Sequence, residues 1–354
     1  MADFTMPALG ADMETGKIVQ WHVKPGDPVK SGDVVAVVET HKGAIDVECF
    51  LDGVINNLAP PDVELPVGAV LATVHTADTA GTATVKPTAP PDERVRLSPA
   101  ARRRARERSL SLDAVPGKPA DGVVARTVTK TGFDPTQMRQ AIAAAMGRSK
   151  REIPHYYLSS TIDFGTAQTW LEVWNHQREP IDRLLPAVLM LKATAKALVE
   201  VPQLNGFYEN GAYRAAPAIH LGWAVALRGG GLVAPAIHDA HQKTLPELMA
   251  ALRDLVQRAR AGGLRSSELT DPTITVTSLG ERGAESVLGV IYPPQVAIVG
   301  FGRVVQRPWV LAGQVVPRAL VTVSLAADHR ASDGHVGGQL LAAIDTALQS
   351  PDQL

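Results

Sequence analysis

The sequence predicts a chain with two folded parts, a small all-β domain followed by a larger α/β domain. Three observations lead to this prediction. Short β-branched runs separated by regular turn signals fill residues 1–76. Residues 77–93 are rich in alanine, threonine and proline and lack aromatics, which is typical of a linker. From about Phe133 onward, long helical patterns alternate with β-branched strands, as in an α/β core.

The composition narrows the class of protein. Of the 354 residues, 45% are hydrophobic and 20% are charged, which excludes a wholly disordered chain. The formal net charge of −1 argues against a general nucleic-acid-binding protein. Cys49 is the single cysteine, so neither an internal disulfide nor a cysteine-rich zinc site is expected.

Neither a secretory signal nor a membrane span is expected from the sequence. It begins without a basic start or an apolar run. The best candidate span, residues 187–199, is interrupted by Lys192 and Lys196, and no run of about 18 apolar residues occurs. We therefore expect a cytoplasmic protein with no membrane partner.

The all-β domain contains a weak internal repeat. Residues 16–18 (GKI) resemble residues 53–55 (GVI), and the strand ending at Val38 resembles the strand ending at Val74. Two similar halves predict two interlocked antiparallel sheets related by a pseudo-twofold axis. Between the halves we expect a tight hairpin with Lys42 at its tip. An exposed lysine is usually a solvated charge, but this placement favours a modification site, because the amine stands clear of the domain surface.

A short basic segment follows the linker. Ser98 is a good N-cap and Pro99 suits a first helical turn, so a helix is expected to begin there. Its basic residues are Arg102, Arg103, Arg104 and Arg106. Their charge suits an acidic partner, and a merely solvated helix is an equally good interpretation. Nucleic acid is a poorer one, because no aromatics are interleaved.

The most specific chemical signal lies near the end of the chain. A β-rich run, Ala319 to Leu325, leads to His329, which is followed by Asp333 and Gly334. An isolated histidine is more often structural than catalytic. The ordinary pKa of histidine is close to neutrality, however, so His329 can accept a proton and return it. Asp333 can organise the local turn or contact an arginine, and Gly334 permits close backbone approach.

Catalysis by this motif needs a nucleophile, and the chain shows none of its own. Cys49 is better interpreted as a small core residue, and no Gly-x-Ser-x-Gly elbow occurs. A thiol brought by a carrier or cofactor fits. Thr277, at the end of a strand in ITVTSLG, can donate its hydroxyl to an oxyanion. A threonine-rich strand with ordinary β propensity is an equally good interpretation.

Two further patterns are interpreted as structural. The run Gly229–Gly231 lacks the following Lys-Ser/Thr of a phosphate loop, which favours a turn between strands. Four other histidines lack convincing metal-ligand spacing with acidic partners, so no structural metal is expected. They are His155, His220, His238 and His241.

Residues 1–76 resemble a lipoyl domain. The resemblance is carried by MPALGADMETGKIVQWHVKPGD and GDVVAVVETHKGAIDVE. It implies that lipoate is attached by an amide bond to Lys42. His41 and Gly43 replace the usual Asp and Ala of the tip, which bears on recognition by a ligase or a decarboxylase. A biotin domain is the alternative, although its lysine normally lies between two methionines and none is present here.

From about Met138 to the end, the chain resembles the dihydrolipoyl acyltransferases, the core components of 2-oxo acid dehydrogenase complexes. The segments that carry the resemblance are VPQLNG, GGLVAPAIHDAHQKTLPEL, TVTSLG, IYPPQVAIVGFGRV and ADHRASDG. It implies a catalytic domain over residues 130–354 with a fold like chloramphenicol acetyltransferase. It also implies three subunits in each functional unit, with the active site between subunits. The expected partners are a thiamine-diphosphate-dependent 2-oxo acid decarboxylase and a dihydrolipoyl dehydrogenase.

The same resemblance implies roles for individual residues. His329 is the general base for the thiol of coenzyme A, Thr277 stabilises the tetrahedral oxyanion, and Asp333 supports the site. Asn205 and Gly334 belong to the active-site neighbourhood. An arginine that family members often carry on the helix after the first catalytic strand is absent, so the ionic partner of Asp333 stays open.

Residues 94–129 resemble a truncated peripheral-subunit-binding domain whose second helix is missing. Arg102, Arg103 and Arg106 are its candidates for partner docking. Taken together, the sequence predicts transfer of an acyl group from a lipoyl-lysine arm to coenzyme A. TVTSLG favours an acetyl- or branched-chain-type enzyme, and assembly of trimers into a cage stays open. The alternative is a non-catalytic lipoyl-bearing scaffold, although a pure scaffold need not keep His329 and Asp333.

Overall fold

The computed structural model describes most of the chain. The described residues are 1–9, 13–40, 43–75, 135–227, 231–281 and 283–354. The predicted linker (77–93) and the predicted basic segment (94–129) lie outside them, so the helix expected from Ser98 is not described. Lys42, Arg102, Arg103 and Arg106 also lie outside them.

The β region consists of two four-stranded antiparallel sheets, with strand orders β1-β8-β6-β3 and β5-β4-β2-β7. The strands are β1 (Ala2–Thr5), β2 (Thr15–Trp21), β3 (Pro28–Val29), β4 (Val34–Thr40), β5 (Gly43–Glu48), β6 (Gly53–Asn56), β7 (Glu64–Pro66) and β8 (Val70–His75). Each sheet takes two strands from the first half of the region and two from the second. This exchange is the interlocked arrangement that the internal repeat predicts.

The repeat is also visible in the core between these sheets. Ile18 and its repeat equivalent Ile55 are fully buried, and so are Val38 and its equivalent Val74. Equivalent positions of the two halves therefore fill one shared core. Cys49 is completely buried as well, and burial raises the pKa of its thiol. Its predicted role as a core residue is confirmed.

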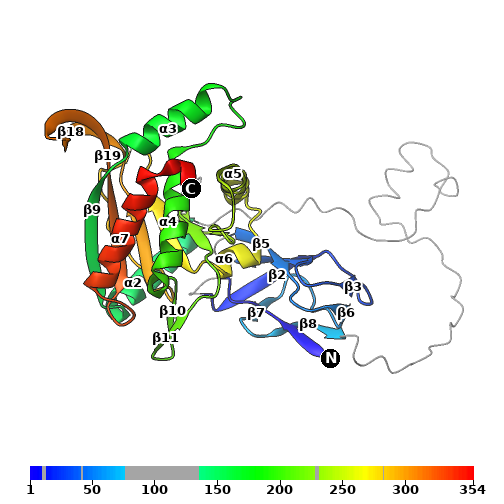
Figure 1. Ribbon diagram of the computed structural model, residues 1–354. Helices are drawn as coiled ribbons and strands as arrows, with labels where there is room; N and C mark the ends of the chain where they lie inside the picture. Colours follow the sequence, from blue (N-terminus) through cyan, green and yellow to red (C-terminus); the bar gives the residue numbers. More distant parts are fainter. Residues whose placement is uncertain (10–12, 41–42, 76–134, 228–230, 282) are drawn as a thin grey trace, which may run out of the picture. The chain divides into compact units, whose positions relative to one another are not determined.

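The α/β region is built on a central sheet with strand order β15-β12-β16-β17-β19-β18, in which β9 also pairs with β19 (Figure 1). These strands are β9 (His155–Asp163), β12 (Leu221–Trp223), β15 (Ala236–Ile237), β16 (Ile274–Ser278), β17 (Ala297–Phe301), β18 (Val305–Leu311) and β19 (Gln314–Asp328). Two small hairpins add β10 (Gly206–Glu209) with β11 (Ala212–Ala215), and β13 (Val225–Ala226) with β14 (Leu232–Val233). Strands β13 and β14, which flank the glycine-rich run in the sequence, pair with each other, whereas Gly229 and Gly230 lie outside the described residues.

The helices of this region are α2 (Pro135–Glu152), α3 (Gly165–His176), α4 (Pro186–Glu200), α5 (Leu245–Ala261), α6 (Ser266–Thr270) and α7 (Gly334–Gln349), with 3-10 turns η2 (Pro202–Leu204) and η3 (Pro351–Gln353). Helices α3, α4, α5 and α7 cover one face of the central sheet. The end of α2 lies at the other face, where the Ser149 hydroxyl donates to the carbonyl of Ile291. Helices α4 and α7 pack side by side (Figure 1). Leu189 and Leu191 of α4 share a core with Val299 and Leu325 of the sheet.

Helix α4 confirms the predicted helix at 186–199. Every residue from Val188 to Ala195 is buried, including Lys192. The Lys192 Nζ donates to the carbonyls of His241 and Lys243, at 2.7 and 2.5 Å. These bonds explain a lysine in an apolar helix, because buried donors need partners. No helix among the described residues is long and apolar enough to cross a membrane.

The other face of the sheet is covered by the chain between α6 and β17. Ile291 packs with Ile298 and Ala326 in a small separate core. The Ser324 hydroxyl of β19 donates to the carbonyl of Val287. Strand β17 and the second half of β19 are therefore buried on both faces, whereas β18 is largely exposed. Polar side chains can gather at the ends of the buried strands.

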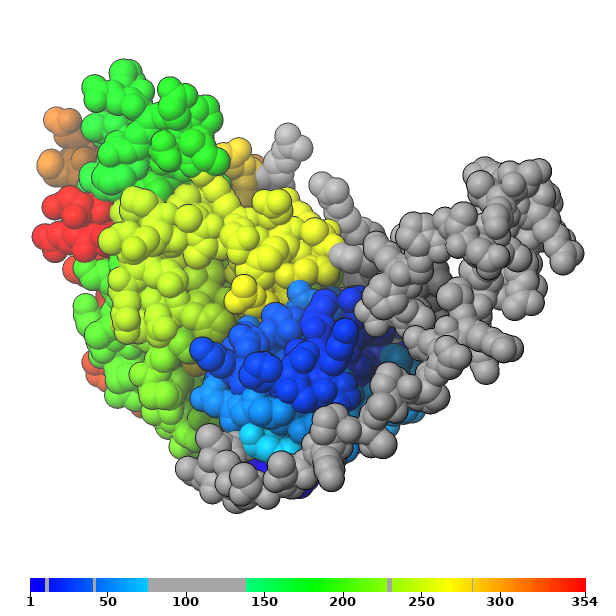
Figure 2. Space-filling view, turned by 90° about the vertical axis from the view of Figure 1, so that its right-hand side faces the viewer, coloured from blue at the N-terminus to red at the C-terminus, as the bar shows by residue number. Residues whose placement is uncertain are grey.

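Helices α5 and α6 lie side by side at the surface (Figure 2). Helix α5 begins with a capping box between Thr244 and Glu247. The guanidinium of Arg258, near the end of α5, donates to both carboxylate oxygens of Glu268 in α6, at 2.6 and 2.5 Å. This bidentate pair joins the two helices.

Candidate functional site

His329 is delivered by the longest strand of the sheet. Strand β19 ends at Asp328, and the His329 amide donates to the carbonyl of Pro154 at 3.0 Å. The Asp328 carboxylate is fully buried and accepts from the Arg330 backbone N–H at 2.9 Å and from its Nη2 at 2.7 Å. The backbone is therefore fixed on both sides of His329, while the imidazole is exposed.

Asp333 is the N-cap residue of α7. Its Oδ1 accepts from the backbone N–H groups of His335 and Val336, both at 3.0 Å. The bond from Val336 is the main cause of a lowered pKa at Asp333. Among the described residues, Asp333 forms no ion pair with an arginine. Of the two alternatives for Asp333, the structure shows organisation of the local turn.

Tyr156 lies against His329, a contact that no sequence pattern predicted. The two ring centroids are 5.2 Å apart with an interplanar angle of 67°. The Tyr156 hydroxyl is 2.9 Å from Oγ of Ser332. Tyr156 reaches this position because β9 pairs with β19, where it stands opposite Ala327. Only a prediction of that long-range pairing could have found the contact.

Thr277 lies at the other end of the sheet from His329. It pairs with Gly300 of β17, which pairs with Ser324 of β19. His329 is five residues further along the chain than Ser324, directly after the end of β19. With a rise of about 3.3 Å per residue and a strand spacing of about 4.8 Å, the two backbones are roughly 19 Å apart. One chain therefore does not bring the His329 and Thr277 side chains to a common atom.

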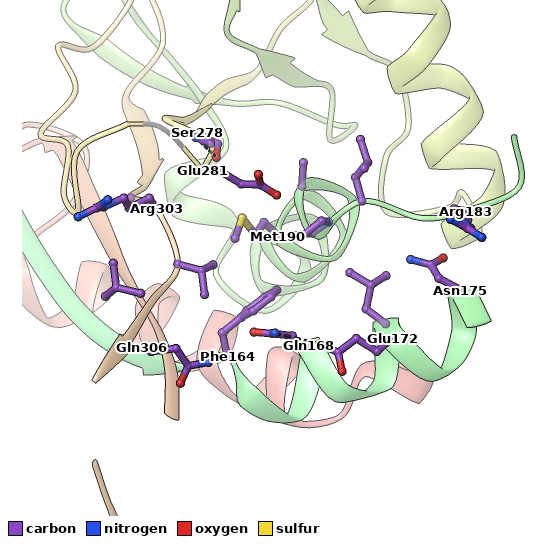
Figure 3. A pocket seen from close by; sticks show the side chains of 18 of the residues that line it. Phe164, Gln168, Glu172, Asn175, Arg183, Met190, Ser278, Glu281, Arg303 and Gln306 are labelled. Carbon is purple, nitrogen blue, oxygen red and sulfur yellow. Dashed lines mark hydrogen bonds between the residues drawn. The ribbon is translucent and has the colours of Figure 1, made fainter. Parts of the chain in front are cut away.

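A cavity of about 900 Å³ opens at the Thr277 end of the sheet (Figure 3). Phe164 at the start of α3 and Met190 of α4 give it apolar walls. Ser278 and Glu281 lie across the cavity from Phe164 (Figure 3). Ser278 lines this cavity and Thr277 does not, because successive side chains of a strand point to opposite faces.

Asn205 is buried at the His329 end of the sheet. Its amide nitrogen donates to the carbonyl of Ala218 at 2.8 Å, and its oxygen accepts from the Thr273 hydroxyl at 2.5 Å. These contacts connect the segment just before β10 with the residue just before β16. Gly334 begins α7, and a Cβ there would meet no described atom within 4 Å. A close approach to Gly334 would have to come from outside the described chain.

His155 is held in one neutral tautomer. Its Nδ1 donates to the carbonyl of Ile153 at 2.9 Å, and its Nε2 accepts from the Ile291 amide at 3.1 Å. Burial lowers its pKa. The residue therefore joins two segments of the fold and is not placed to exchange protons.

His220 and His238 form a second cluster, with ring centroids 4.8 Å apart. His238 Nε2 is 2.9 Å from the Asp271 carboxylate, and this hydrogen bond raises the pKa of His238. Burial and the neighbouring His238 lower the pKa of His220. Within the described ranges, no three His, Cys, Asp or Glu side chains are grouped as metal ligands would be.

The predicted lysine hairpin is formed by β4 and β5. Thr40 pairs with Gly43, so the residues between the paired strands are His41 and Lys42. Gly43 has φ of 108°, which favours glycine, and a Cβ there would meet nothing within 4 Å. The surroundings of Gly43 are open, as an attached arm requires.

Two family models match the chain and show which protein family it belongs to. The family model described as 2-oxoacid dehydrogenases acyltransferase (catalytic domain) matches residues 129–354, more than half of the chain. The chain belongs to this acyltransferase family. A second family model, described as biotin-requiring enzyme, matches residues 2–74. The predicted lipoyl-dependent acyl transfer to coenzyme A within a 2-oxo acid dehydrogenase complex is confirmed at family level.

Relatives match the acyltransferase over nearly their full length. It is 27% identical to the dihydrolipoyllysine-residue acetyltransferase component of the pyruvate dehydrogenase complex of Rickettsia conorii, over 98% of this chain and 97% of that protein. It is 29% identical to the corresponding component of the acetoin cleaving system of Bacillus subtilis, over 99% and 98%.

Solved structures agree with the fold of the catalytic region. A probable dihydrolipoamide acetyltransferase from Listeria monocytogenes covers 67% of this chain and 96% of its own, with 28% identity and a TM-score of 0.54. The Azotobacter vinelandii dihydrolipoamide acetyltransferase covers 68% and 98%, with 25% identity and a TM-score of 0.57. The predicted fold class, a lipoyl-type β domain with an acyltransferase α/β domain, is confirmed.

Proposed function

We propose that the acyltransferase site consists of His329 from one subunit and Thr277 from another. The observation that carries the proposal is their separation of roughly 19 Å at opposite ends of one sheet. A general base and an oxyanion donor must both reach the reacting carbonyl. A second copy of the chain is therefore needed, and a closed ring of three copies supplies one such site at each interface.

In this site coenzyme A provides the thiol nucleophile. His329 Nε2 or Nδ1 accepts the thiol proton as the sulfur attacks the carbonyl of the acyl thioester. The Thr277 hydroxyl donates to the oxyanion that develops on that carbonyl. The carbonyl re-forms as the bond to the departing sulfur breaks, and His329 returns the proton to that sulfur. Acyl-coenzyme A and a free thiol result, so atoms and charge balance.

Residues 1–76 form the lipoyl domain in this proposal, and Lys42 is the attachment point. The pairing of Thr40 with Gly43 and the open space at Gly43 support it, because an attached arm needs open surroundings. When bound, the lipoyl group supplies a thiol that carries the acyl group. We assign residues 77–93 to a linker, 94–129 to the truncated docking segment and 130–354 to the catalytic domain.

The acyl group we propose is acetyl. The observation that favours it over a branched chain is that both relatives described above are named as acetyltransferase components. The partners are then a thiamine-diphosphate-dependent decarboxylase that loads the arm and a dihydrolipoyl dehydrogenase that reoxidises it. Arg102, Arg103 and Arg106 are the proposed docking residues, and the cytoplasm is the proposed location.

The test is an acyl-transfer assay with free dihydrolipoamide and acetyl-, branched-chain acyl- and succinyl-coenzyme A. The highest kcat/KM is expected with acetyl-coenzyme A. A higher value with another donor would reassign the acyl group but leave the acyltransferase in place. No transfer from any donor by correctly folded protein would favour the alternative, a non-catalytic lipoyl-bearing scaffold.

A further inference from the structure

We propose that Tyr156 is a positioning residue for the acyl-transfer reaction, holding the imidazole of His329 and the turn that follows it. The inference rests on the proposed role of His329 as general base. It assigns to Tyr156 and its partner Ser332 the task of setting the direction of the exposed imidazole. Neither residue needs to touch the substrate.

The need for such a residue follows from the surroundings of His329. Its backbone is fixed by the bond to Pro154. In the part of the chain that the structure describes, however, the imidazole forms no hydrogen bond, and its neighbour Asp333 directs its carboxylate to the N–H groups of α7. An exposed imidazole with no such bond rotates freely unless another group restrains it.

The Tyr156 ring supplies this restraint. Its centroid is 5.2 Å from that of His329, at an interplanar angle of 67°. This edge-to-face arrangement is a favoured one for aromatic pairs. Strand pairing fixes the Tyr156 backbone, because Tyr156 stands opposite Ala327, two residues before His329. The ring therefore approaches the imidazole from a rigid element.

The Tyr156 hydroxyl extends the restraint over the whole turn. It lies 2.9 Å from Ser332 Oγ, next to the N-cap residue Asp333. Tyr156 thus contacts the first residue of the His329-to-Asp333 turn with its ring and the fourth with its hydroxyl. Burial raises the pKa of this hydroxyl, so it keeps its proton at neutral pH and the bond is available throughout.

Helix α7 closes the remaining side of the ring. A Cβ added at Gly337 would lie 3.0 Å from Cε2 of Tyr156, and 2.8 and 2.9 Å from Leu158 and Leu325. Only a residue without a Cβ lets α7 approach so closely. The ring is therefore enclosed by strand, turn and helix, which is the support that an accurately held catalytic group requires.

The experiment compares Tyr156→Leu and Tyr156→Phe with the same substitutions at Tyr157 in the full-length protein. Tyr157 lies on the opposite face of β9, and its hydroxyl interacts with Lys150. We expect Tyr156→Leu to lower kcat by about 10- to 100-fold with an unchanged KM for coenzyme A, because small misplacements are costly. Tyr156→Phe keeps the ring and should lose about 5-fold. Both Tyr157 variants should keep their kcat.

Two double substitutions separate positioning from a merely structural effect. Ser332→Ala should lose as much as Tyr156→Phe, and combining them should cost no more than either alone, because they share one bond. In protein already carrying His329→Ala, Tyr156→Leu should not lower the residual rate further. A further loss there, a raised KM without a lower kcat, or equal behaviour of the Tyr156 and Tyr157 variants would overturn the proposal.

The same set of variants distinguishes this proposal from the proposed function. If His329→Ala keeps near-normal turnover, the acyl-transfer mechanism itself is wrong. If His329→Ala is inactive while Tyr156→Leu and Tyr156→Phe keep normal kcat, the mechanism stands and the positioning role is wrong. Thermal unfolding of each variant shows whether it is folded, and the isosteric Tyr156→Phe keeps the test decisive should Tyr156→Leu unfold.

Discussion

Thr277 and His329 lie at opposite ends of the central sheet. Strands β16 and β17 are parallel, and β19 runs against them, so the residue after β19 lies beyond the amino ends of the other two. Thr277 is near the carboxyl end of β16. No side-chain rotation closes a backbone separation of roughly 19 Å. Because one chain cannot bring both side chains to the same carbonyl, the proposed chemistry requires an oligomer.

Mixed oligomers test this condition. His329→Ala and Thr277→Val are each expected to be nearly inactive alone. After co-expression or exchange of subunits, interfaces that combine the intact Thr277 of one variant with the intact His329 of the other should be active. For random equal mixing this is about one interface in four. Activity is measured on the mixture and on each variant alone, and a mixture no more active than its components would contradict a shared site.

The single variants test the separate roles. His329→Ala should lower kcat by about 10²–10⁴-fold, the usual value of general-base assistance. Thr277→Val should cost up to about 10²–10³-fold, the range found for an oxyanion donor. In both, the KM for coenzyme A should stay nearly fixed, because the lost interactions belong to the transition state. If Thr277→Val raises only KM, Thr277 binds substrate and does not stabilise the oxyanion.

Local signals were sufficient to predict much of this molecule. Turn residues and the internal repeat predict the two interlocked sheets, because equivalent residues such as Ile18 and Ile55 fill one core. The pattern around Lys192 predicts α4 although a lysine is buried there. No sequence signal predicted the contact of Tyr156 with His329, because it arises from the pairing of β9 with β19, which joins residues more than 150 positions apart and leaves no periodic signal. The Asp328–Arg330 pair is local, but the complete burial of Asp328 becomes visible only in the fold.

The His238–Asp271 pair gives a pH-dependent contribution to stability. The pKa of His238 is raised, chiefly by its hydrogen bond to Asp271. Protonated His238 therefore contributes to the free energy of unfolding. This contribution is fully present below about pH 6.5, the ordinary pKa of histidine, and is lost as the pH rises through the pKa of His238 in the folded protein. Burial would raise the pKa of Asp271, but the bond and charge of His238 outweigh it, so that carboxylate stays ionised in this window.

We therefore expect Asp271→Asn to destabilise the protein more at pH 6 than at pH 9. Both side chains are over one-third exposed, so the difference should not exceed about 1 kcal/mol. Urea unfolding followed by tryptophan fluorescence measures it. Asp254→Asn is the control, because Asp254 pairs with Arg258, whose guanidinium stays charged between pH 6 and pH 9. An Asp271→Asn effect equal at both pH values would refute the coupling.

Lys42 is predicted to be the one lipoylated residue. Protein made with lipoate and a competent ligase should show a single lipoyl adduct by intact mass. Lys42→Arg should abolish the adduct and change stability by no more than about 0.5 kcal/mol, as is usual for a surface substitution. Activity with free dihydrolipoamide should be unchanged in Lys42→Arg, because the catalytic groups are untouched. An adduct that persists in this variant would place the attachment elsewhere.

Arg330 is predicted to be essential for stability at the catalytic turn. Its guanidinium donates to the Asp328 carboxylate, which has no exposed side-chain surface, and it stacks on Tyr208 with its centre 3.9 Å from the ring centroid. Arg330→Leu leaves that carboxylate buried without its charged partner, which should cost about 3 kcal/mol or more.

The matched control is Arg148→Leu. Arg148 forms an exposed pair with Glu152, so its replacement should lower the free energy of unfolding by at most about 1 kcal/mol. Chemical denaturation of both variants measures the two costs. Since Asp328 and Arg330 flank His329, Arg330→Leu should also lower kcat. Equal stability losses in the two variants would show that the Asp328 pair does not fix this turn.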